Sequence, residues 1–513
     1  RVRAVYGVWK GAKQTPGFQK LQRKMAPKLA AFSDKITQNT ALFKRIQKIY
    51  EGRETAGLSA EQKRLVEELY RHFVRSGAKL EAESKKELSR INQELAKLYT
   101  RFAQNVLADE NKKYLVLEGE NDLAGIPPSL RQAAKAKAKS MKMPDKWIIS
   151  NTRSSVDPFL TYSERRDLRE KAWRMFVNRG DFGGETDNNA LITKVLGLRA
   201  QRAKLLGYPT HAHWRLEETM AKKPETVLKL LMAVWKPAVA RVKQEVAQMQ
   251  AIADAEGKKF RIQPWDYHYY AEKVRKKKYN LDESQIKPYM QLARLQKGTF
   301  WVAEELFGFK FKKLAEVPVF HEAVTVYEVT HGDTNKTVGL FYYDPWARSG
   351  KRSGAWMTAY RVQHRLGGEV LPIVSNNTNF LKGKPGAPVL ISWDDARTLF
   401  HEFGHALHGL SSQVIYPSLA GTAVPLDYVE FPSQFVENLL DTPQVLNRFA
   451  KHHKTGEPIP KELVQRIQKA STFKQGFKTV EFLASAIMDM KLHLAGAKKI
   501  DPDTFERETL ASL

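Results

Sequence analysis

The feature that most restricts the fold of this chain is a helical spacing of apolar residues that continues to about residue 245. Its clearest stretch has apolar side chains three or four residues apart, at Leu88, Ile91, Leu95, Leu98, Phe102 and Val106. This spacing places them on one face of an α-helix, because one helical turn takes about 3.6 residues. Glycine, proline and aspartate interrupt the pattern at 125–128, 157–158, 180–184 and 207–209. The first half of the chain is therefore predicted to be a series of α-helices.

A different pattern begins near residue 320, where apolar and polar residues alternate. The segments 324–329 and 338–343, joined by a polar turn, predict a β-hairpin. Further strands are predicted at 370–374 and 389–392, and the chain is helical again beyond residue 395. The expected fold class is therefore mainly α, with a small sheet at about 320–392 next to a long helix.

Composition excludes several kinds of site. The 513 residues contain no cysteine, so a disulfide framework, a thiolate metal site and a cysteine nucleophile are ruled out. Any metal must bind to His, Asp or Glu. A membrane span is not expected, because lysine and arginine interrupt even the most apolar long run, 227–242.

The chain is strongly basic, with 84 Lys and Arg against 56 Asp and Glu, or 84 − 56 = +28. Such an excess attracts polyanions or carboxylates. Its densest runs, 135–142 and 273–278, lie on helix-like stretches without a glycine-aromatic RNA-binding signature. A solvated basic surface is the favoured interpretation, and a nucleic-acid-binding scaffold is a remote alternative.

The sequence His401-Glu402-Phe403-Gly404-His405 is an H-E-x-x-H motif. On a helix its histidines lie one turn apart and can bind one metal ion, while Glu402 can act as general base on a water. Ser392 or Asp394 can cap this helix, and Gly409 can close it. A glycine in mid-helix, Gly404, predicts close packing by another element.

A catalytic zinc ion takes three protein ligands and keeps one position open. His408 lies too far along the same helix axis to be the third ligand, and we expect it to lie near the site without binding the metal. Glu430 lies near the start of a second predicted helix, which can return antiparallel to the first. From the spacing alone, Glu430 is as compatible with a metal ligand as with an exposed carboxylate. Asp427 and Glu437 are candidate hydrogen-bond partners of the histidines, or solvated helix charges.

Three segments carry a family resemblance: 398–410 (TLFHEFGHALHGL), 416–437 (YPSLAGTAVPLDYVEFPSQFVE) and 339–356 (GLFYYDPWARSGKRSGAW). With weaker likeness at 197–223 and 265–270, the chain resembles the thimet-oligopeptidase-like family of zinc metallopeptidases. Its likeness is strongest to the bacterial peptidyl-dipeptidase branch.

The resemblance implies that His401, His405 and Glu430 bind one zinc ion and that Glu402 is the catalytic base. It also implies a two-lobed helical fold with a deep channel that admits short peptides. We expect an N-terminal helical lobe at 1–200 and a catalytic region at 201–513, with the zinc site at 398–437 and interleaving of the lobes allowed.

The ends of the chain lead to an expectation of truncation. Residue 1 is Arg1 rather than Met. Family members continue beyond the equivalent of Leu513 with a glycine-tyrosine loop, whose Tyr and a nearby His contact the substrate carbonyl. The chain is therefore expected to be a copy shortened at both ends. A monomer in the cytoplasm is expected, or in the bacterial periplasm if a leader has been lost.

The expected activity is release of dipeptides from the free C-terminus of oligopeptides, with cleavage of internal bonds in short peptides as the alternative. Arg348, Lys351 and Arg352 are candidates for binding the C-terminal carboxylate, although each is equally compatible with solvated surface charge. The predicted strand 370–374 can offer an edge to an extended peptide or serve only as a structural strand.

Overall fold

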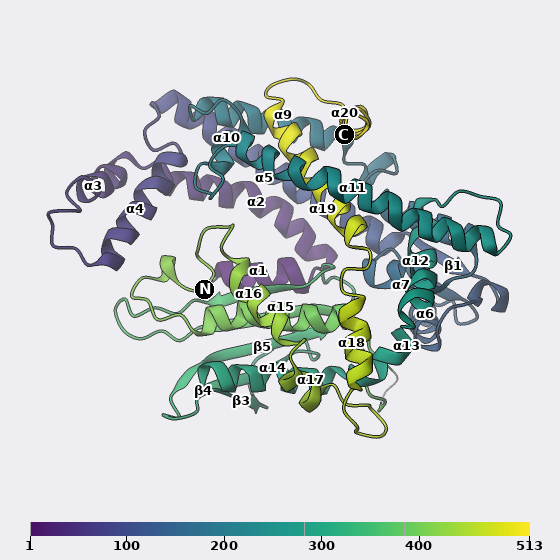
Figure 1. The fold of residues 1–513 in the computed structure, drawn as a ribbon. Helices are drawn as coiled ribbons and strands as arrows, with labels where there is room; N and C mark the ends of the chain where they lie inside the picture. The colour runs from purple at the N-terminus through teal and green to yellow at the C-terminus, as the bar shows by residue number, and fades with distance from the viewer. Residues whose placement is uncertain (1, 282, 384–385) are drawn as a thin grey trace. The chain divides into compact units, whose positions relative to one another are not determined.

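A computed structural model describes residues 2–281, 283–383 and 386–513 (Figure 1). The chain forms two compact units, and each unit contains three separate stretches of sequence. The first unit consists of Arg1–Gln14, Glu110–Arg179 and Val239–Phe477, and the second of Thr15–Asp109, Gly180–Ala238 and Lys478–Leu513. The expected division into lobes near residue 200 stays a prediction.

The second unit is helical throughout its described elements. It contains α2 (Pro16–Thr37), α3 (Thr40–Glu51), α4 (Ala60–Arg75), α9 (Asn189–Leu205), α10 (His211–Leu216) and α20 (Pro502–Ala511), with most of α5 (Ala82–Lys112) and α19 (Gln475–Leu494). Helix α11 (Pro224–Ala255) continues from this unit into the first.

Helix α5 follows the predicted apolar spacing along only part of its length. Its residues Ile91, Leu95 and Leu98 are buried in one cluster with side chains of α9. Further along, Phe102 is exposed and Val106 is only half-buried. The buried face there consists instead of Gln104, Asn105 and Leu107, two of which are polar and do not show in an apolar pattern.

The first unit combines helices with two sheets. Its elements before residue 310 are α1 (Val2–Ala12), β1 (Tyr114–Leu117), α6 (Pro128–Ser140), β2 (Trp147–Ser150), α7 (Arg153–Tyr162), α8 (Arg166–Val177), α12 (Pro264–Tyr279), α13 (Glu283–Ile286) and α14 (Leu292–Phe307). The predicted break at 157–158 is wrong, because Pro158 lies inside α7. Its neighbours Phe159 and Leu160 are buried, so packing outweighs the helix-breaking tendency of proline. The other three predicted breaks lie between helices.

The larger sheet contains β3 (Phe309–Leu314), β4 (Thr325–His331), β5 (Thr337–Trp346), β6 (Trp356–Arg361) and β7 (Ile373–Phe380), in the order β3-β4-β5-β7-β6. Strands β4 and β5 form the predicted antiparallel hairpin. The strand predicted at 389–392 is wrong, because that stretch makes only an isolated bridge between Leu390 and Gln291. The strand predicted at 370–374 is shifted to β7, whose later residues are polar and buried.

Strand β7 lies inside the sheet, between β5 and β6. It therefore has no free edge on which an extended peptide could pair, so of the two alternatives for this strand the structural one holds and the peptide-pairing edge is wrong. The described edges of the sheet are β3 and β6.

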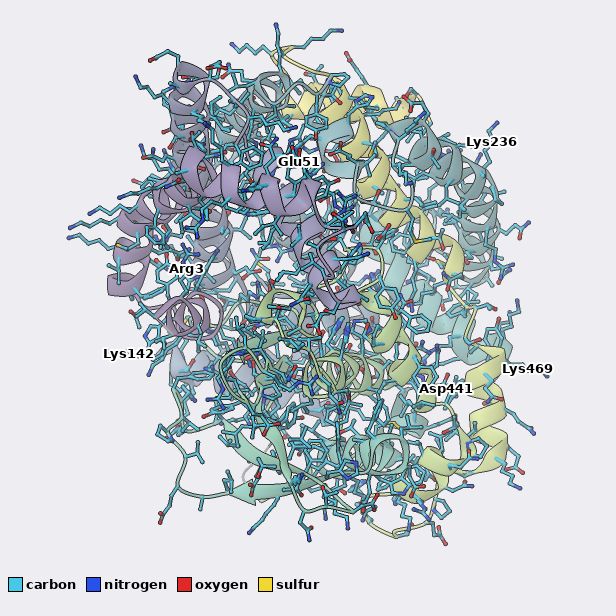
Figure 2. The ribbon with its side chains drawn as sticks, turned by 90° about the vertical axis from the view of Figure 1, so that its left-hand side faces the viewer. Arg3, Glu51, Lys142, Lys236, Asp441 and Lys469 are labelled. Carbon is cyan, nitrogen blue, oxygen red and sulfur yellow. The ribbon has the colours of Figure 1, made fainter. Side chains whose placement is uncertain are left out.

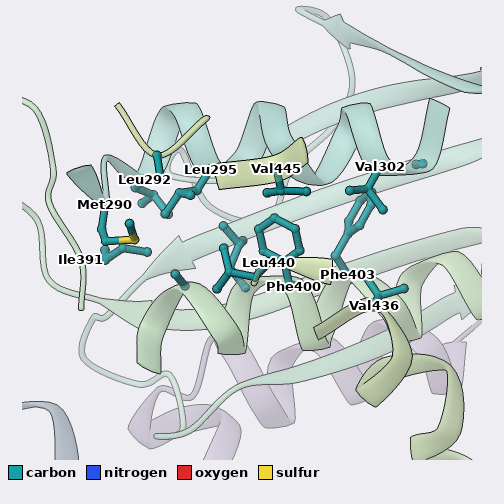
Figure 3. Close-up of a cluster of buried hydrophobic side chains, with 14 of the residues drawn as sticks. Met290, Leu292, Leu295, Val302, Ile391, Phe400, Phe403, Val436, Leu440 and Val445 are labelled. Carbon is teal, nitrogen blue, oxygen red and sulfur yellow. The ribbon is translucent and has the colours of Figure 1, made fainter. Parts of the chain in front are cut away.

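The core of the first unit lies between the large sheet and the helices around it. These include α14, α15 (Trp393–Leu410), α16 (Glu430–Leu439), α17 (Pro443–Phe449) and α18 (Lys461–Lys469). Phe400 and Phe403 of α15 face α14, and Val436 of α16 joins the same cluster (Figure 3). The prediction of a mainly helical chain with a small sheet beside the motif helix is confirmed.

Basic side chains lie on the surface of both units. Lys142, Lys236 and Lys469 are exposed, and their side chains extend away from the ribbon (Figure 2). Within the described residues, no helix combines the length and apolar character that a membrane crossing requires.

Candidate metal centre

The motif lies on α15, and this helix begins with a reciprocal cap. The Oγ of Ser392 accepts a hydrogen bond from the backbone N–H of Asp395 at 3.0 Å, and Asp395 Oδ2 accepts one from the N–H of Ser392 at 3.1 Å. Ser392 is therefore the cap, whereas Asp394 lies inside the first turn.

Gly409 does not close α15, because the helix continues to Leu410. A Cβ atom at Gly409 would lie 2.9 Å from Met357 Cε and 2.9 Å from Val374 Cγ1. The glycine is therefore required for close packing of the helix on β6 and β7.

Helix α16 packs against the motif at Gly404, as the sequence predicts. A Cβ atom at Gly404 would lie 2.7 Å from Ser433 Cα and 2.9 Å from the carbonyl oxygen of Pro432. Since both contacts are with backbone atoms, the two helices can approach this closely only at a glycine. Glu430 is the first residue of α16, and this packing brings it to the histidines.

We expect Gly404→Ala to lower the free energy of unfolding by about 1–3 kcal/mol, because the methyl group overpacks the α15–α16 contact. Gly197→Ala in α9 is the matched control, since no atom lies within 4 Å of a Cβ there. That change should stabilise the protein by up to about 1 kcal/mol through helix propensity. Urea unfolding of both variants measures the difference, and equal effects would contradict the proposed close packing.

Two imidazoles and one carboxylate meet at a single point. Glu430 Oε2 lies 3.2 Å from His401 Nε2 and 3.1 Å from His405 Nε2. Among the described residues, these three side chains form a group whose potential ligand atoms all lie within 4.8 Å of one another. Two nitrogen donors and one oxygen donor match the ligands of a catalytic zinc site. His408 is not part of this group.

Surrounding side chains orient these donors. His401 Nδ1 lies 2.9 Å from Glu437 Oε2, and donation there leaves a lone pair on Nε2 for a metal. Arg397 donates two hydrogen bonds to Glu437 Oε1, at 2.9 and 2.7 Å. Asp427, the other candidate partner, is exposed.

Ser433 is a site residue that the sequence interpretation missed. Its Oγ lies 2.9 Å from Glu430 Oε2 and 2.8 Å from the backbone oxygen of Glu430. The signal was available, because residues three apart near a helix start are neighbours and the serine follows Glu430 at that spacing.

Glu402 is buried beside the group of His401, His405 and Glu430, with 6% of its surface exposed. Burial raises the pKa of its carboxyl to about 7, and the Glu430 carboxylate contributes in the same direction. His401 and Arg352 oppose that shift. Asn376 of β7, also missed, donates a 2.6 Å hydrogen bond to the backbone oxygen of Glu402. A carboxylate with this pKa is suited to exchanging a proton near neutral pH.

The three basic candidates lie between β5 and β6 in different environments. Arg348 binds both carboxylate oxygens of Asp344, at 2.6 and 2.8 Å. Lys351 is buried, with its Nζ 3.0 Å from Asp344 Oδ1, and burial lowers its pKa to about 8. Arg352 is exposed. Their binding to a substrate stays a prediction.

Sequence comparison with known proteins points to one family. A model of peptidase family M3 matches residues 159–513. The dipeptidyl carboxypeptidase of Salmonella typhimurium is 37% identical over 515 residues, which cover 100% of this chain and 75% of that protein. The Escherichia coli dipeptidyl carboxypeptidase is 37% identical with the same coverage, and oligopeptidase A of Salmonella typhimurium is 32% identical over 94% of this chain and 72% of its own length. Because the family match spans most of the chain and includes both helices of the metal centre, this chain belongs to peptidase family M3.

Proposed function

We propose that this chain is a zinc-dependent peptidase that releases dipeptides from the free C-terminus of oligopeptides. The observation that carries the proposal is the meeting of His401, His405 and Glu430 beside the buried carboxylate of Glu402. The identity to two dipeptidyl carboxypeptidases, 37%, exceeds the 32% identity to oligopeptidase A and supports dipeptide release.

The side chains of the site divide the chemistry among them. A zinc ion held by His401, His405 and Glu430 would supply Lewis acidity toward the scissile carbonyl and acidify a water. Glu402 accepts the proton of the attacking water and delivers it to the amine of the leaving peptide. Glu437 keeps the His401 ring in the orientation that presents Nε2 to the ion.

We expect the zinc-loaded chain to cut a dipeptide from a short peptide with a free C-terminus and to spare the same peptide when its C-terminus is amidated. The reason is that a dipeptide-releasing site must bind the terminal carboxylate. Mass spectrometry of the products measures both reactions.

The cleavage products also distinguish dipeptide release from the alternative functions. Equal internal cleavage of the free and amidated peptides would contradict dipeptide release and indicate an oligopeptidase. If no peptide is cut and the chain binds DNA or RNA with a steep dependence on salt, the remote alternative of a nucleic-acid-binding scaffold would replace both.

A further inference from the structure

We propose that Arg352 binds a carboxylate of the peptide substrate beside the metal centre. This inference rests on the proposed function, because it assigns a substrate group to the same site. The carboxylate belongs either to the free C-terminus or to an acidic side chain of the peptide. Both present the same chemistry to a guanidinium, and the experiment below separates them.

Two of the three cations in the loop between β5 and β6 are paired with a buried carboxylate. Asp344 is buried and forms ion pairs with both Arg348 and Lys351. Lys351 Nζ also donates to three backbone oxygens, at 2.6 to 3.0 Å. These two cations therefore have a structural role, and exposing either to a substrate would break a buried ion pair. Arg352 has no acidic hydrogen-bond or ion-pair partner within the described residues, and its side chain is exposed.

Arg352 is held in place without an ion-pair partner among the described residues. Its guanidinium carbon lies 4.1 Å from the centre of the Trp356 ring. Its backbone N–H donates to the oxygen of Gly11 at 2.9 Å, and its own oxygen accepts from Asn379 Nδ2 at 2.9 Å. Stacking on an aromatic ring fixes the planar guanidinium while leaving its N–H groups free for a bidentate carboxylate. A preorganised donor loses less entropy on binding.

Strand β7 connects Arg352 to the reacting groups. Asn379, which holds the backbone of Arg352, and Asn376, which holds the backbone of Glu402, belong to the same strand β7. Three residues of strand span roughly 10 Å. The charges also interact, because partial burial of the guanidinium lowers the pKa of Arg352 and the Glu402 carboxylate partly offsets that shift. Arg352 and Glu402 are therefore both anchored on one strand, so a peptide whose scissile bond lies near Glu402 can place a carboxylate at Arg352.

Peptide binding to the zinc-loaded Glu402→Gln protein tests the proposal without turnover. Labelled short peptides are compared in four forms, with a free or amidated C-terminus and with Glu or Gln near it. We expect Arg352→Gln to weaken binding of the peptides that carry the recognised carboxylate by about 10-fold or more, the effect of losing a charge-assisted hydrogen bond. Lys313→Gln on the edge strand β3 removes an exposed charge elsewhere in the first unit and serves as the matched control.

The pattern across the four peptides decides the outcome. A loss confined to free C-termini supports the terminal carboxylate as the ligand, and a loss confined to Glu-containing peptides supports an acidic side chain. Equal effects of Arg352→Gln and Lys313→Gln, or an equal loss for all four peptides, would overturn the proposal. If the wild-type chain still releases dipeptides in that case, the proposed function stands and only the role of Arg352 fails.

Discussion

Glu402→Gln should abolish peptide hydrolysis while the protein keeps its zinc. Positioned general bases contribute about 10²- to 10⁴-fold to rate, so a decrease in kcat of that size is expected. The substitution preserves the shape of the side chain and leaves His401, His405 and Glu430, the proposed ligands, in place. The bond from Asn376 is made to the backbone oxygen of Glu402 rather than to its carboxylate, so the helix keeps this anchor in the variant.

The measurement pairs steady-state peptide cleavage with zinc content after dialysis. Zinc content equal to that of the wild type, together with lost activity, assigns the proton transfer to Glu402. Asp395→Asn is a control for a carboxyl group on the same helix that lies at the cap rather than at the metal centre. Full activity of Glu402→Gln would contradict the role of base, and a loss of zinc would mean that the side chain also supports the metal.

The motif helix and its partner were the most predictable parts of the molecule. The mid-helix glycine at position 404 predicted a close neighbour, and α16 supplies it through the backbone of Ser433. The sequence left open whether Glu430 is a metal ligand or an exposed carboxylate. Spacing along the chain does not show in which direction a side chain points. The direction comes from the packing of α16 on α15, which sequence patterns do not describe.

The polar strand β7 and the glycine near the end of the motif helix were the least predictable parts. Strand β7 contains Ser375, Asn376 and Asn377, which are buried because their side chains bond to backbone and to one another. An alternation of apolar and polar residues cannot reveal such a strand. Gly409 was read as a helix end because glycine often ends helices, yet here it allows contact with the sheet.

The second large effect is a loss of metal affinity, which we expect in Glu430→Ala. The substitution removes one of three donors, and it leaves the two Nε2 atoms of His401 and His405 without the carboxylate that lies 3.2 and 3.1 Å from them. The loss of a side chain that only orients a ligand typically lowers metal affinity by about 10- to 100-fold. Removal of a ligand itself should exceed that range, as measured by competition with a chelator of known zinc affinity.

Two further variants rank the groups around the ion. Glu437→Gln keeps a hydrogen-bond acceptor near His401 Nδ1 but removes its charge, so its loss of affinity should be smaller than that of Glu430→Ala. His408→Ala should retain zinc like the wild type. His408 lies on the same helix as His401 and His405 but outside the group that meets at Glu430. If His408→Ala loses zinc and Glu430→Ala does not, the third ligand is His408. The sequence argument from the axis of the helix would then be wrong, because α15 would have to bend to bring that histidine to the ion.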